Sequence, residues 1–233
     1  MRKEKFISVI IAAAGQGKRM NSEMNKQYLN LCNKPVLART IEAFDQSFFI
    51  DEIIVVTHPD EIQYCRERII NSFGFKKVTK VVAGGAERQE SILNGLKAVD
   101  ERCDIVAIHD GARPFIKEET ILNSIDQAIK YKAVGVGVPV KDTIKVVDEE
   151  KNIKNTPDRK TLWAIQTPQV FDYKLVLKAH KKAIEDGYQG TDDTVLVERI
   201  GEDLKMVMGH YENIKITTPE DLYIGEAILK NRN

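Results

Sequence analysis

Cysteine is scarce in this sequence and is not arranged in pairs. The three cysteines, Cys32, Cys65 and Cys103, are odd in number and widely spaced. A disulfide framework uses an even set, and a structural zinc site uses closely spaced ligand pairs, so neither is expected here. We expect reduced thiols and a cytoplasmic protein.

The chain also lacks an excess of either charge and a long apolar run. Thirty-five basic residues balance thirty-five acidic ones. The broad positive field of a sequence-independent nucleic-acid binder is therefore missing, and no nucleic-acid partner is expected. The apolar run after the basic start MRKEK is short and ends in a glycine turn, so we expect a buried strand there and no membrane partner.

No internal repeat or low-complexity tract divides the 233 residues. A chain of this length buries roughly 70% of its unfolded surface around one core, so it needs neither metal nor disulfide to fold. We expect a single domain over residues 1–233.

Short apolar runs alternate along the chain with segments of helical period. The runs lack two-residue alternation, which is typical of strands covered on both faces of a sheet. The segments between them repeat apolar residues every three or four positions, as amphipathic helices do. This order predicts an α/β fold, a Rossmann-like three-layer sandwich with a mostly parallel central sheet. The predicted strands are 6–12, 52–57, 80–83 and 104–109, and the predicted helices lie near 36–44, 92–99 and 121–129.

Ligands of such sheets bind beyond the carboxyl ends of the strands. The loops after Ala12, Ala83 and His109 are therefore where we expect the functional site.

One stretch interrupts the regular succession. Within residues 142–159, Ile144, Val146 and Ile153 surround the polar tip DEEKN, which predicts an inserted β-hairpin arm at about 140–160. A lone hairpin is marginally stable in water, so we expect it to pack on another surface, such as a second subunit.

Two glycines and several basic residues follow the first predicted strand. The dinucleotide fingerprint requires a third glycine where Met20 stands, and the Walker loop requires Ser or Thr where Arg19 stands. Gly15 and Gly17 still allow backbone amides to approach phosphates. The loop is therefore either a polyphosphate site or a tight turn with a solvated basic face. Its basic residues are Lys18, Arg19 and Lys26.

The segment AAAGQGKRM, followed by NKQYLNLCNKPVLARTIEAF, resembles the signature region of sugar-nucleotidyltransferase-like enzymes, specifically the 2-C-methyl-D-erythritol 4-phosphate cytidylyltransferase family. Further segments similar to this family follow in the same order. Together they spread over nearly the whole chain, which makes the resemblance more specific than any one motif. These segments are VVAGGAERQESILNGL, IHDGARPF, GVPVKDTIK, LWAIQTPQVF, TDDTVLVE and NIKITTPEDL.

The resemblance implies a CTP-dependent cytidylyltransferase of the non-mevalonate isoprenoid pathway. It would transfer CMP from CTP to 2-C-methyl-D-erythritol 4-phosphate and release pyrophosphate. The resemblance also implies Mg²⁺ or another divalent cation, and a homodimer formed through the arm. A ribitol-5-phosphate cytidylyltransferase is one alternative, although the acceptor motifs look closer to the first family. A non-catalytic nucleotide-binding regulator is another, although the charged residues Arg19, Lys26 and Asp110 are retained.

The resemblance assigns roles to particular residues. Arg19 and Lys26 are implied to hold the triphosphate and stabilise the transition state, and Asp110 to hold the metal. Thr143 and Arg159 on the arm are implied to serve the neighbouring protomer. The implied catalytic residues are Arg19, Lys26, Arg159 and Lys215. The implied nucleotide-binding residues are Ala13, Ala14, Gly15, Gly17, Lys18, Gly85, Ala86, Ser91, Asp110 and Ala112, and the implied acceptor-binding residues are Arg113, Thr143, Arg159, Thr167, Thr191 and Lys215.

Some of these residues also fit purely structural roles. An Asp-Gly pair after a strand, such as Asp110 and its neighbour, is often a turn. Arg88 either supports its loop or the phosphates, or is an ordinary arginine at a helix start. Asp192 and Asp193 suit the first turn of a helix capped by Thr191, and we favour capping for both aspartates.

Overall fold

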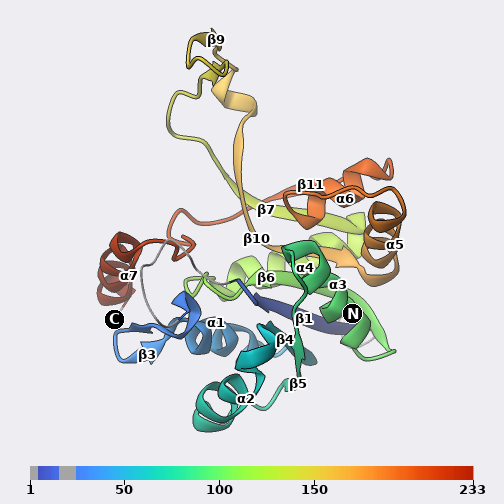
Figure 1. Ribbon diagram of the computed structural model, residues 1–233, viewed down its shortest axis with the longest axis vertical. Coiled ribbons are helices and arrows are strands. Elements are labelled where there is room, and N and C mark those ends of the chain that lie inside the picture. The colour runs from blue at the N-terminus through green and yellow to red at the C-terminus, as the bar shows by residue number, and fades with distance from the viewer. Residues whose placement is uncertain (1–4, 16–24, 233) are drawn as a thin grey trace.

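The computed structural model describes residues 5–15 and 25–232, and of Lys26 it describes the backbone only. A seven-stranded sheet runs through the middle of the molecule (Figure 1) in the order β11-β7-β10-β6-β1-β4-β5. Every strand of this sheet is parallel to β1 except β10, which is antiparallel to β6 and β7. The strands are β1 Phe6–Ala13, β4 Glu52–Thr57, β5 Val78–Ala83, β6 Cys103–Asp110, β7 Ala133–Pro139, β10 Trp163–Asp172 and β11 Lys205–Met208.

Helices cover both faces of the sheet, which confirms the predicted three-layer α/β architecture. Each helix buries one apolar stripe: in α1, Leu37, Ile41 and Phe44 are fully buried, at the spacing that places them on one side. One face carries α1 Val36–Asp45, α2 Ile62–Tyr64 with the π-helix η5 Cys65–Asn71, and α4 Glu118–Tyr131. The other face carries α3 Arg88–Ala98, α5 Tyr173–Glu185 and α6 Asp193–Arg199.

A third, smaller apolar cluster joins the last helix to the start of the chain. Leu222 and Leu229 of α7 (Pro219–Arg232) pack against buried Leu31 and Phe115. A two-residue turn at Cys32 and the next residue, with φ of 47° and 62°, connects the short strands beside Leu31 and suits the twist of an antiparallel pair. The remaining short elements are η3 Lys26–Tyr28, β2 Asn30–Leu31, β3 Lys34–Pro35 and η4 Pro59–Glu61.

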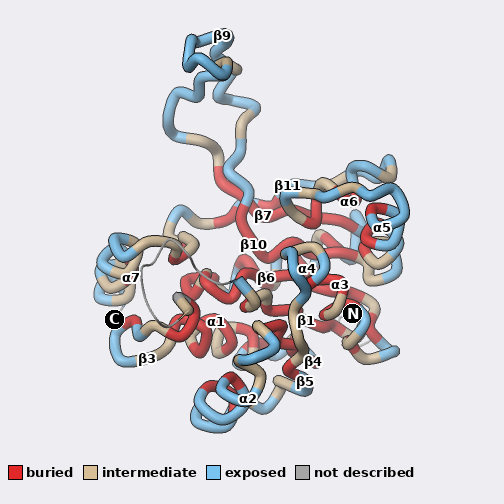
Figure 2. Tube along the Cα trace, in the orientation of Figure 1, coloured by how far each residue is buried: buried red, intermediate tan, exposed pale blue. Residues whose placement is uncertain are grey.

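The predicted arm is present between β7 and β10. Its strands, β8 Val146–Val147 and β9 Ile153–Asn155, pair antiparallel, and the short helix η6 Arg159–Thr161 leads back to β10. The arm projects far from the sheet in Figure 1 and is exposed along most of its length in Figure 2. Its apolar side chains are therefore left in solvent within a single chain.

Several boundaries and connections differ from the predictions. Strand β6 includes Asp110, whereas the predicted strand ends at His109. The strands β7, β10 and β11 were not predicted, although β7 is a continuous apolar run, and the antiparallel β10 sits between β7 and β6. Strand order depends on long-range pairing, so local patterns do not reveal it.

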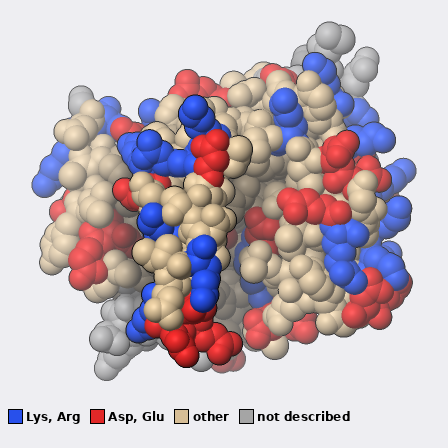
Figure 3. All heavy atoms as spheres, turned by 90° about the horizontal axis from the view of Figure 1, so that it is seen from above, with Lys and Arg blue, Asp and Glu red and all other residues tan. Residues whose placement is uncertain are grey.

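The charges on the surface agree with the balanced composition, and the helices agree with the lack of a long apolar run in the sequence. On the face shown in Figure 3, the basic side chains of the described residues are interspersed with acidic ones and form no broad field of one sign. Within residues 5–15 and 25–232, no helix has both the length and the apolar character needed to cross a bilayer.

Candidate nucleotide-binding site

A cavity of about 510 Å³ opens at the carboxyl ends of the central strands. It lies where the chain reverses its direction of travel across the sheet, because β4 and β6 lie on opposite sides of β1. Crossovers diverge at such a point and leave a crevice for ligands. Most of the lining comes from the three predicted loops, and His58 after β4 and Lys215 ahead of α7 add to it. The lining residues are Ala12, Ala13, Ala14, Gly15, Gln27, His58, Gly85, Ala86, Glu87, Arg88, Ser91, Asp110, Ala112 and Lys215.

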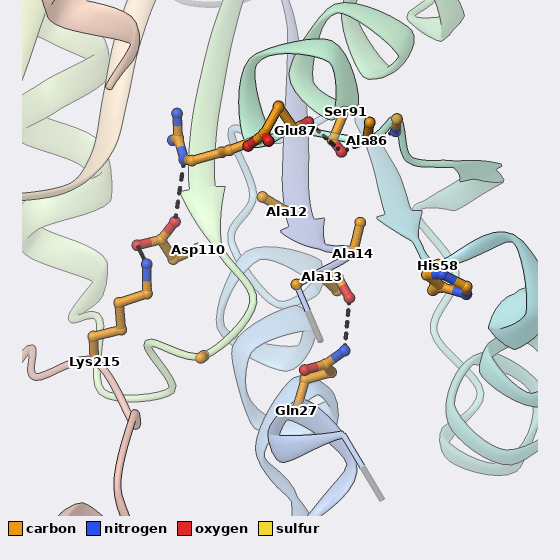
Figure 4. A pocket seen from close by; sticks show the side chains of 14 residues that line it. Ala12, Ala13, Ala14, Gln27, His58, Ala86, Glu87, Ser91, Asp110 and Lys215 are labelled. Atoms are coloured by element: carbon orange, nitrogen blue, oxygen red, sulfur yellow. Dashed lines mark hydrogen bonds and ion pairs between the residues drawn. The ribbon is translucent and has the colours of Figure 1, made fainter. Parts of the chain in front are cut away.

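The cavity has a charged side and an amide-rich side. In Figure 4, Asp110 and Lys215 lie on one side, His58 lies on the other, and Ala13 and Ala14 lie between them. Small side chains at the end of β1 leave the backbone open to a ligand, which suits close approach of a phosphate or a base. The charged side, in contrast, is suited to neutralising an anion.

Asp110 is the centre of the charged side. Lys215 Nζ lies 2.9 Å from Asp110 Oδ2, and Arg113 Nε lies 3.4 Å from the same oxygen. Arg88 Nε lies 3.9 Å from Oδ1. Burial opposes ionisation of this carboxyl, but Lys215, Arg88 and Arg113 together hold the pKa of Asp110 well below its usual range. The carboxylate is therefore ionised, and the cations around it exceed it in charge.

A buried hydrogen-bond chain fixes Asp110 from behind. The Asp110 amide donates to Thr167 Oγ1 at 3.1 Å, and Thr167 Oγ1 lies 3.0 Å from His109 Nδ1. His109 Nε2 lies 3.1 Å from the Arg113 carbonyl, which can only accept, so Nε2 carries the proton. Nδ1 then accepts from the Thr167 hydroxyl. Thr167 thus uses its proton internally and stands behind Asp110, outside the cavity lining.

His109 is expected to make the protein less stable in acid. Burial lowers its pKa to about 4, whereas an unfolded histidine titrates near 6.5. Between these pH values the unfolded chain takes up a proton that the folded chain refuses, so stability falls as pH falls through this window. Relative to His109→Gln, which does not titrate, the wild type should lose roughly 2 to 3 kcal/mol of unfolding free energy between pH 7.5 and 4.5. Urea unfolding of both proteins at the two pH values measures this loss. A difference in unfolding free energy that does not change with pH would contradict the prediction.

The second glycine loop forms the opposite rim and is held by its own helix. The Gly85 amide donates to Ser91 Oγ at 3.0 Å, and the Ser91 hydroxyl donates to the Glu87 carbonyl at 3.0 Å. A Cβ at Gly84 would lie 2.5 Å from Ala14 Cβ, so only glycine allows the two rims to approach this closely. Ser91, at the cavity wall, keeps an unused lone pair that can accept a hydrogen bond.

The backbone of Lys26 lies at the cavity rim because its neighbours are anchored there. Gln27 Nε2 donates to the Ala13 carbonyl at 2.7 Å, and Tyr28 Oη lies 2.9 Å from Thr57 Oγ1 at the end of β4. Asn25 donates to the Glu61 carboxylate on the other flank. The other predicted basic-loop residues, Gly17, Lys18 and Arg19, lie outside the described residues.

The structure places some predicted acceptor-binding residues away from this cavity. Thr143 and Arg159 are exposed on the arm, where Arg159 Nη1 donates to the Lys141 carbonyl at 2.7 Å. Thr191 is exposed ahead of α6, and Arg113 contacts Asp110 without lining the cavity. Thr167 also stands outside the lining. The cavity brings together these predicted residues: Ala13, Ala14, Gly15, Gly85, Ala86, Ser91, Asp110, Ala112 and Lys215.

The capping prediction for α6 is right for Asp192 and wrong for its two neighbours. The cap is Asp192, whose carboxylate accepts from the Val195 amide at 3.0 Å, and not Thr191. Asp193 does not cap; its Oδ2 lies 2.7 Å from Arg88 Nη2. Because the cap is one residue later than predicted, Asp193 points inward. There its long-range ion pair with Arg88 outweighs a local capping hydrogen bond.

Sequence reasoning left Arg88 undecided and missed Gln27 and His58 as lining residues. Gln27 directly follows Lys26 in the motif, so its position was predictable from the motif. His58 stands after the predicted strand 52–57 where a dinucleotide site would have an acidic residue, and it matched no motif. The contact of Arg88 with Asp193 spans 105 positions and has no local signal.

Comparison with known proteins gives a consistent result. A family model described as 2-C-methyl-D-erythritol 4-phosphate cytidylyltransferase matches residues 7–231. The enzyme of that name from Caldanaerobacter subterraneus subsp. tengcongensis is 56% identical over 224 residues, covering 96% of this chain and 99% of that protein. Its counterpart in Clostridioides difficile is 54% identical and covers 95% and 93% of the two chains.

A solved structure shares both the fold and the extent of the chain. The crystal structure of 4-diphosphocytidyl-2C-methyl-D-erythritol synthase from Anaerococcus prevotii superposes with a TM-score of 0.87 at 37% identity, covering 98% of this chain and 97% of that one. Fold, cavity and full-length sequence similarity thus agree, and this chain belongs to the 2-C-methyl-D-erythritol 4-phosphate cytidylyltransferase family.

Proposed function

We propose that the protein transfers CMP from CTP to 2-C-methyl-D-erythritol 4-phosphate. A phosphate oxygen of the acceptor attacks the α-phosphorus of CTP, and the bond from that phosphorus to the departing pyrophosphate oxygen breaks. The products are 4-diphosphocytidyl-2-C-methyl-D-erythritol and pyrophosphate. The observation that carries this proposal is the group of cations, Lys215, Arg113 and Arg88, around one ionised carboxylate at the cavity wall.

Two anions must meet in this reaction, so catalysis consists mainly of positioning and charge neutralisation. Lys215 lines the cavity, and Arg113 stands directly behind it on Asp110. We assign Lys215 and Arg113 to the acceptor phosphate, and Arg19 and Lys26 to the triphosphate. Residues 1–233 are proposed to form one nucleotidyltransferase domain, because the lining draws on residues from Ala12 to Lys215.

The donor set fits a divalent cation that arrives with the nucleotide. Within the described residues, no three His, Cys, Asp or Glu side chains group into a protein-only metal site. Mg²⁺, however, usually takes one or two protein carboxylates and completes its shell with water and phosphate oxygens. Asp110, ionised and at the cavity wall, would hold such an ion. When bound, the ion would neutralise charge on the triphosphate.

Base selection follows from the hydrogen bonds of Ser91. Its proton is committed to the Glu87 carbonyl, so toward the cavity the side chain can only accept. The exocyclic amine of cytosine donates, whereas the corresponding oxygen of uracil accepts. A buried acceptor that faces another acceptor is left unpaired, which penalises the wrong base. The backbone of Gly85 and Ala86 completes this proposed pocket.

Ser91→Ala is therefore expected to reduce the preference for CTP over UTP. We expect kcat/KM for CTP to fall roughly tenfold or more while that for UTP changes little. Parallel steady-state assays with both nucleotides measure the ratio. Ser124→Ala is the matched control, because Ser124 is also buried in a helix but bonds the Ile121 carbonyl far from the cavity. An equal loss for both nucleotides would show that Ser91 only supports the loop.

The arm is proposed to complete the acceptor site of a neighbouring protomer in a homodimer. Its apolar side chains are unusually exposed for a single chain: Ile153 is 63% exposed and Val147 is 51% exposed. Thr143 and Arg159, at the base of the arm, would then reach the other protomer's acceptor, while Thr191 would act within one chain. Thr167, whose proton is donated to His109, would support Asp110 from behind. A cytoplasmic location remains part of the proposal, supported by the free cysteines.

One assay tests the proposed function. Purified protein is incubated with Mg²⁺, CTP and either 2-C-methyl-D-erythritol 4-phosphate or ribitol 5-phosphate, and pyrophosphate release is measured. We expect release with the first acceptor. Release with ribitol 5-phosphate alone would assign the alternative acceptor, and CTP binding without release on either would indicate a nucleotide-binding regulator.

A further inference from the structure

An ion pair between a buried aspartate and an arginine of the cavity wall joins three helices. Arg88 is the first residue of α3, Asp193 the first residue of α6, and His180 lies in α5. Asp193 Oδ2 lies 2.7 Å from Arg88 Nη2, and Asp193 Oδ1 lies 3.1 Å from His180 Nε2. Asp193 is 1% exposed and His180 is fully buried. Both carboxylate oxygens therefore have a fixed partner away from water.

The helix does not require this carboxylate for its own stability. Asp192 already caps α6, and the Asp193 amide is satisfied by Gln169 Oε1 at 3.0 Å. Burial opposes ionisation of Asp193, but Arg88 and the hydrogen bond from His180 hold its pKa below the ordinary value. An ionised group in this position costs desolvation that an apolar side chain would avoid. The contact with Arg88 explains why an ionised aspartate is buried at position 193.

Arg88 is anchored tightly on one side and loosely on the other. Its contact with Asp193 is 2.7 Å, whereas its Nε lies 3.9 Å from Asp110 Oδ1. Its side chain is 33% exposed and lines the cavity, so N–H groups remain available to a ligand there. Without Asp193, the carboxylate left within reach would be Asp110, and the guanidinium would fold onto it and away from the ligand.

His180 fits the same purpose. Its Nε2 faces Asp193, while its buried Nδ1 has no hydrogen-bond partner among the described residues. A buried imidazole with only one of its two nitrogens satisfied is a poor choice for simple packing. It is a suitable choice for fixing the rotamer of Asp193, because only the contact through Nε2 is needed.

We infer that Asp193 and His180 are positioning residues that hold Arg88 against the triphosphate of the bound nucleotide. The inference rests on the proposed function, because that function supplies the triphosphate. Arg88 offers charge-assisted hydrogen bonds to the phosphates, and Asp193 fixes the direction in which the guanidinium presents them.

Calorimetric titration with CTP and Mg²⁺ tests this on the full chain. We expect Arg88→Gln and Asp193→Asn each to weaken CTP binding about tenfold, as expected for loss of one charge-assisted contact. The double variant should bind no more weakly than Arg88→Gln alone, because Asp193 acts only through Arg88. The matched control is Asp172→Asn, the same change at the N-cap of α5, where the carboxylate accepts from the Leu175 amide at 3.0 Å. It keeps a good cap and should alter CTP affinity less than twofold.

Two changes at His180 separate positioning from packing. His180→Gln keeps a donor near the place of Nε2 and should bind CTP within about twofold of the wild type. His180→Leu fills the space without a donor and should bind about tenfold more weakly. If Asp193→Asn does not fold, the double-variant comparison is made with His180→Leu in its place.

The outcomes are distinct from those of the proposed function. Wild-type protein that neither binds CTP nor releases pyrophosphate would end both proposals. With wild-type binding intact, three results would overturn the inference alone: unchanged CTP affinity in folded Asp193→Asn, losses that multiply in the double variant, or equal behaviour of the two His180 variants. Failure of every Asp193 and His180 variant to fold would show a structural role and overturn it as well.

Discussion

Replacing Lys26 with alanine is expected to lower the turnover number of cytidylyl transfer roughly 10²- to 10³-fold. In the proposed reaction, negative charge gathers on the oxygens around the α-phosphorus as the acceptor approaches. A cation held at this point stabilises the transition state more than the ground state, so kcat falls more than substrate affinity.

The anchoring of the neighbouring residues makes this effect large. Gln27 is bonded to the Ala13 carbonyl and Tyr28 to Thr57, so the backbone at position 26 is fixed at the cavity rim. A charge on a preorganised backbone needs little reorganisation during the reaction. A lysine on a solvated loop would lack this advantage, and its removal would change little.

Steady-state kinetics of pyrophosphate release with saturating CTP and acceptor measures the effect of Lys26→Ala. Lys97→Ala, which removes an exposed lysine from the end of α3, is the matched control and should retain wild-type turnover. Thermal unfolding confirms that both variants are folded. A loss below about fivefold in folded Lys26→Ala would remove this residue from the catalytic assignment.

Mixing two inactive variants is expected to restore about a quarter of the wild-type activity. If the arm of one protomer completes the site of the other, each site uses position 26 of one chain and position 159 of its partner. Lys26→Ala and Arg159→Ala then damage a site through different chains. At equal concentrations, about half of the dimers contain one chain of each kind, and one of their two sites is intact. Recovery of activity in the mixture would therefore show that two protomers share each site.

The exposed position of Arg159 is the reason to expect this result. It lies on the arm, bonded to the Lys141 carbonyl, outside the lining of the cavity in its own chain. A role for Arg159 in catalysis thus requires the arm to meet another molecule. The exposed apolar side chains of the arm, Ile153 and Val147 among them, supply surface for that meeting.

A second mixture controls the first. A chain carrying both Lys26→Ala and Arg159→Ala, mixed equally with wild type, should silence about half of the wild-type activity, because a mixed dimer then has no intact site. If each site were built within one chain, this mixture would leave the wild-type activity unchanged. Absence of recovery in the first mixture, with subunit exchange confirmed by native mass spectrometry, would rule out shared sites.

Local sequence patterns were sufficient for the layers of the fold and for the edge that carries the site. Apolar runs without alternation indicate buried strands, and all four strands predicted in this way end at the cavity: β1, β4, β5 and β6. The hairpin between β7 and β10 was also predictable, because its apolar residues and polar tip lie within one short stretch. These features depend on neighbours in sequence.

Contacts between residues that are far apart in the sequence could not be predicted from such local patterns. Lys215 reaches Asp110, and Arg88 reaches Asp193 at 105 positions' distance. The Thr167 hydroxyl donates to His109, whereas the family motif would assign that hydroxyl to a substrate. Whether a polar group is free for a ligand depends on which partners the fold supplies.

The sequence alone determined the alternation of strands and helices in the first half of the chain, the hairpin arm, the family resemblance and the three loops expected to meet at one edge of the sheet, because each depends on local spacing. Only the tertiary structure decided which side chains at that edge are committed to one another. Asp110 and Asp193 show the reason: the two carboxylates have the same chemistry, and their surroundings alone make one a wall of the cavity and the other a buried anchor.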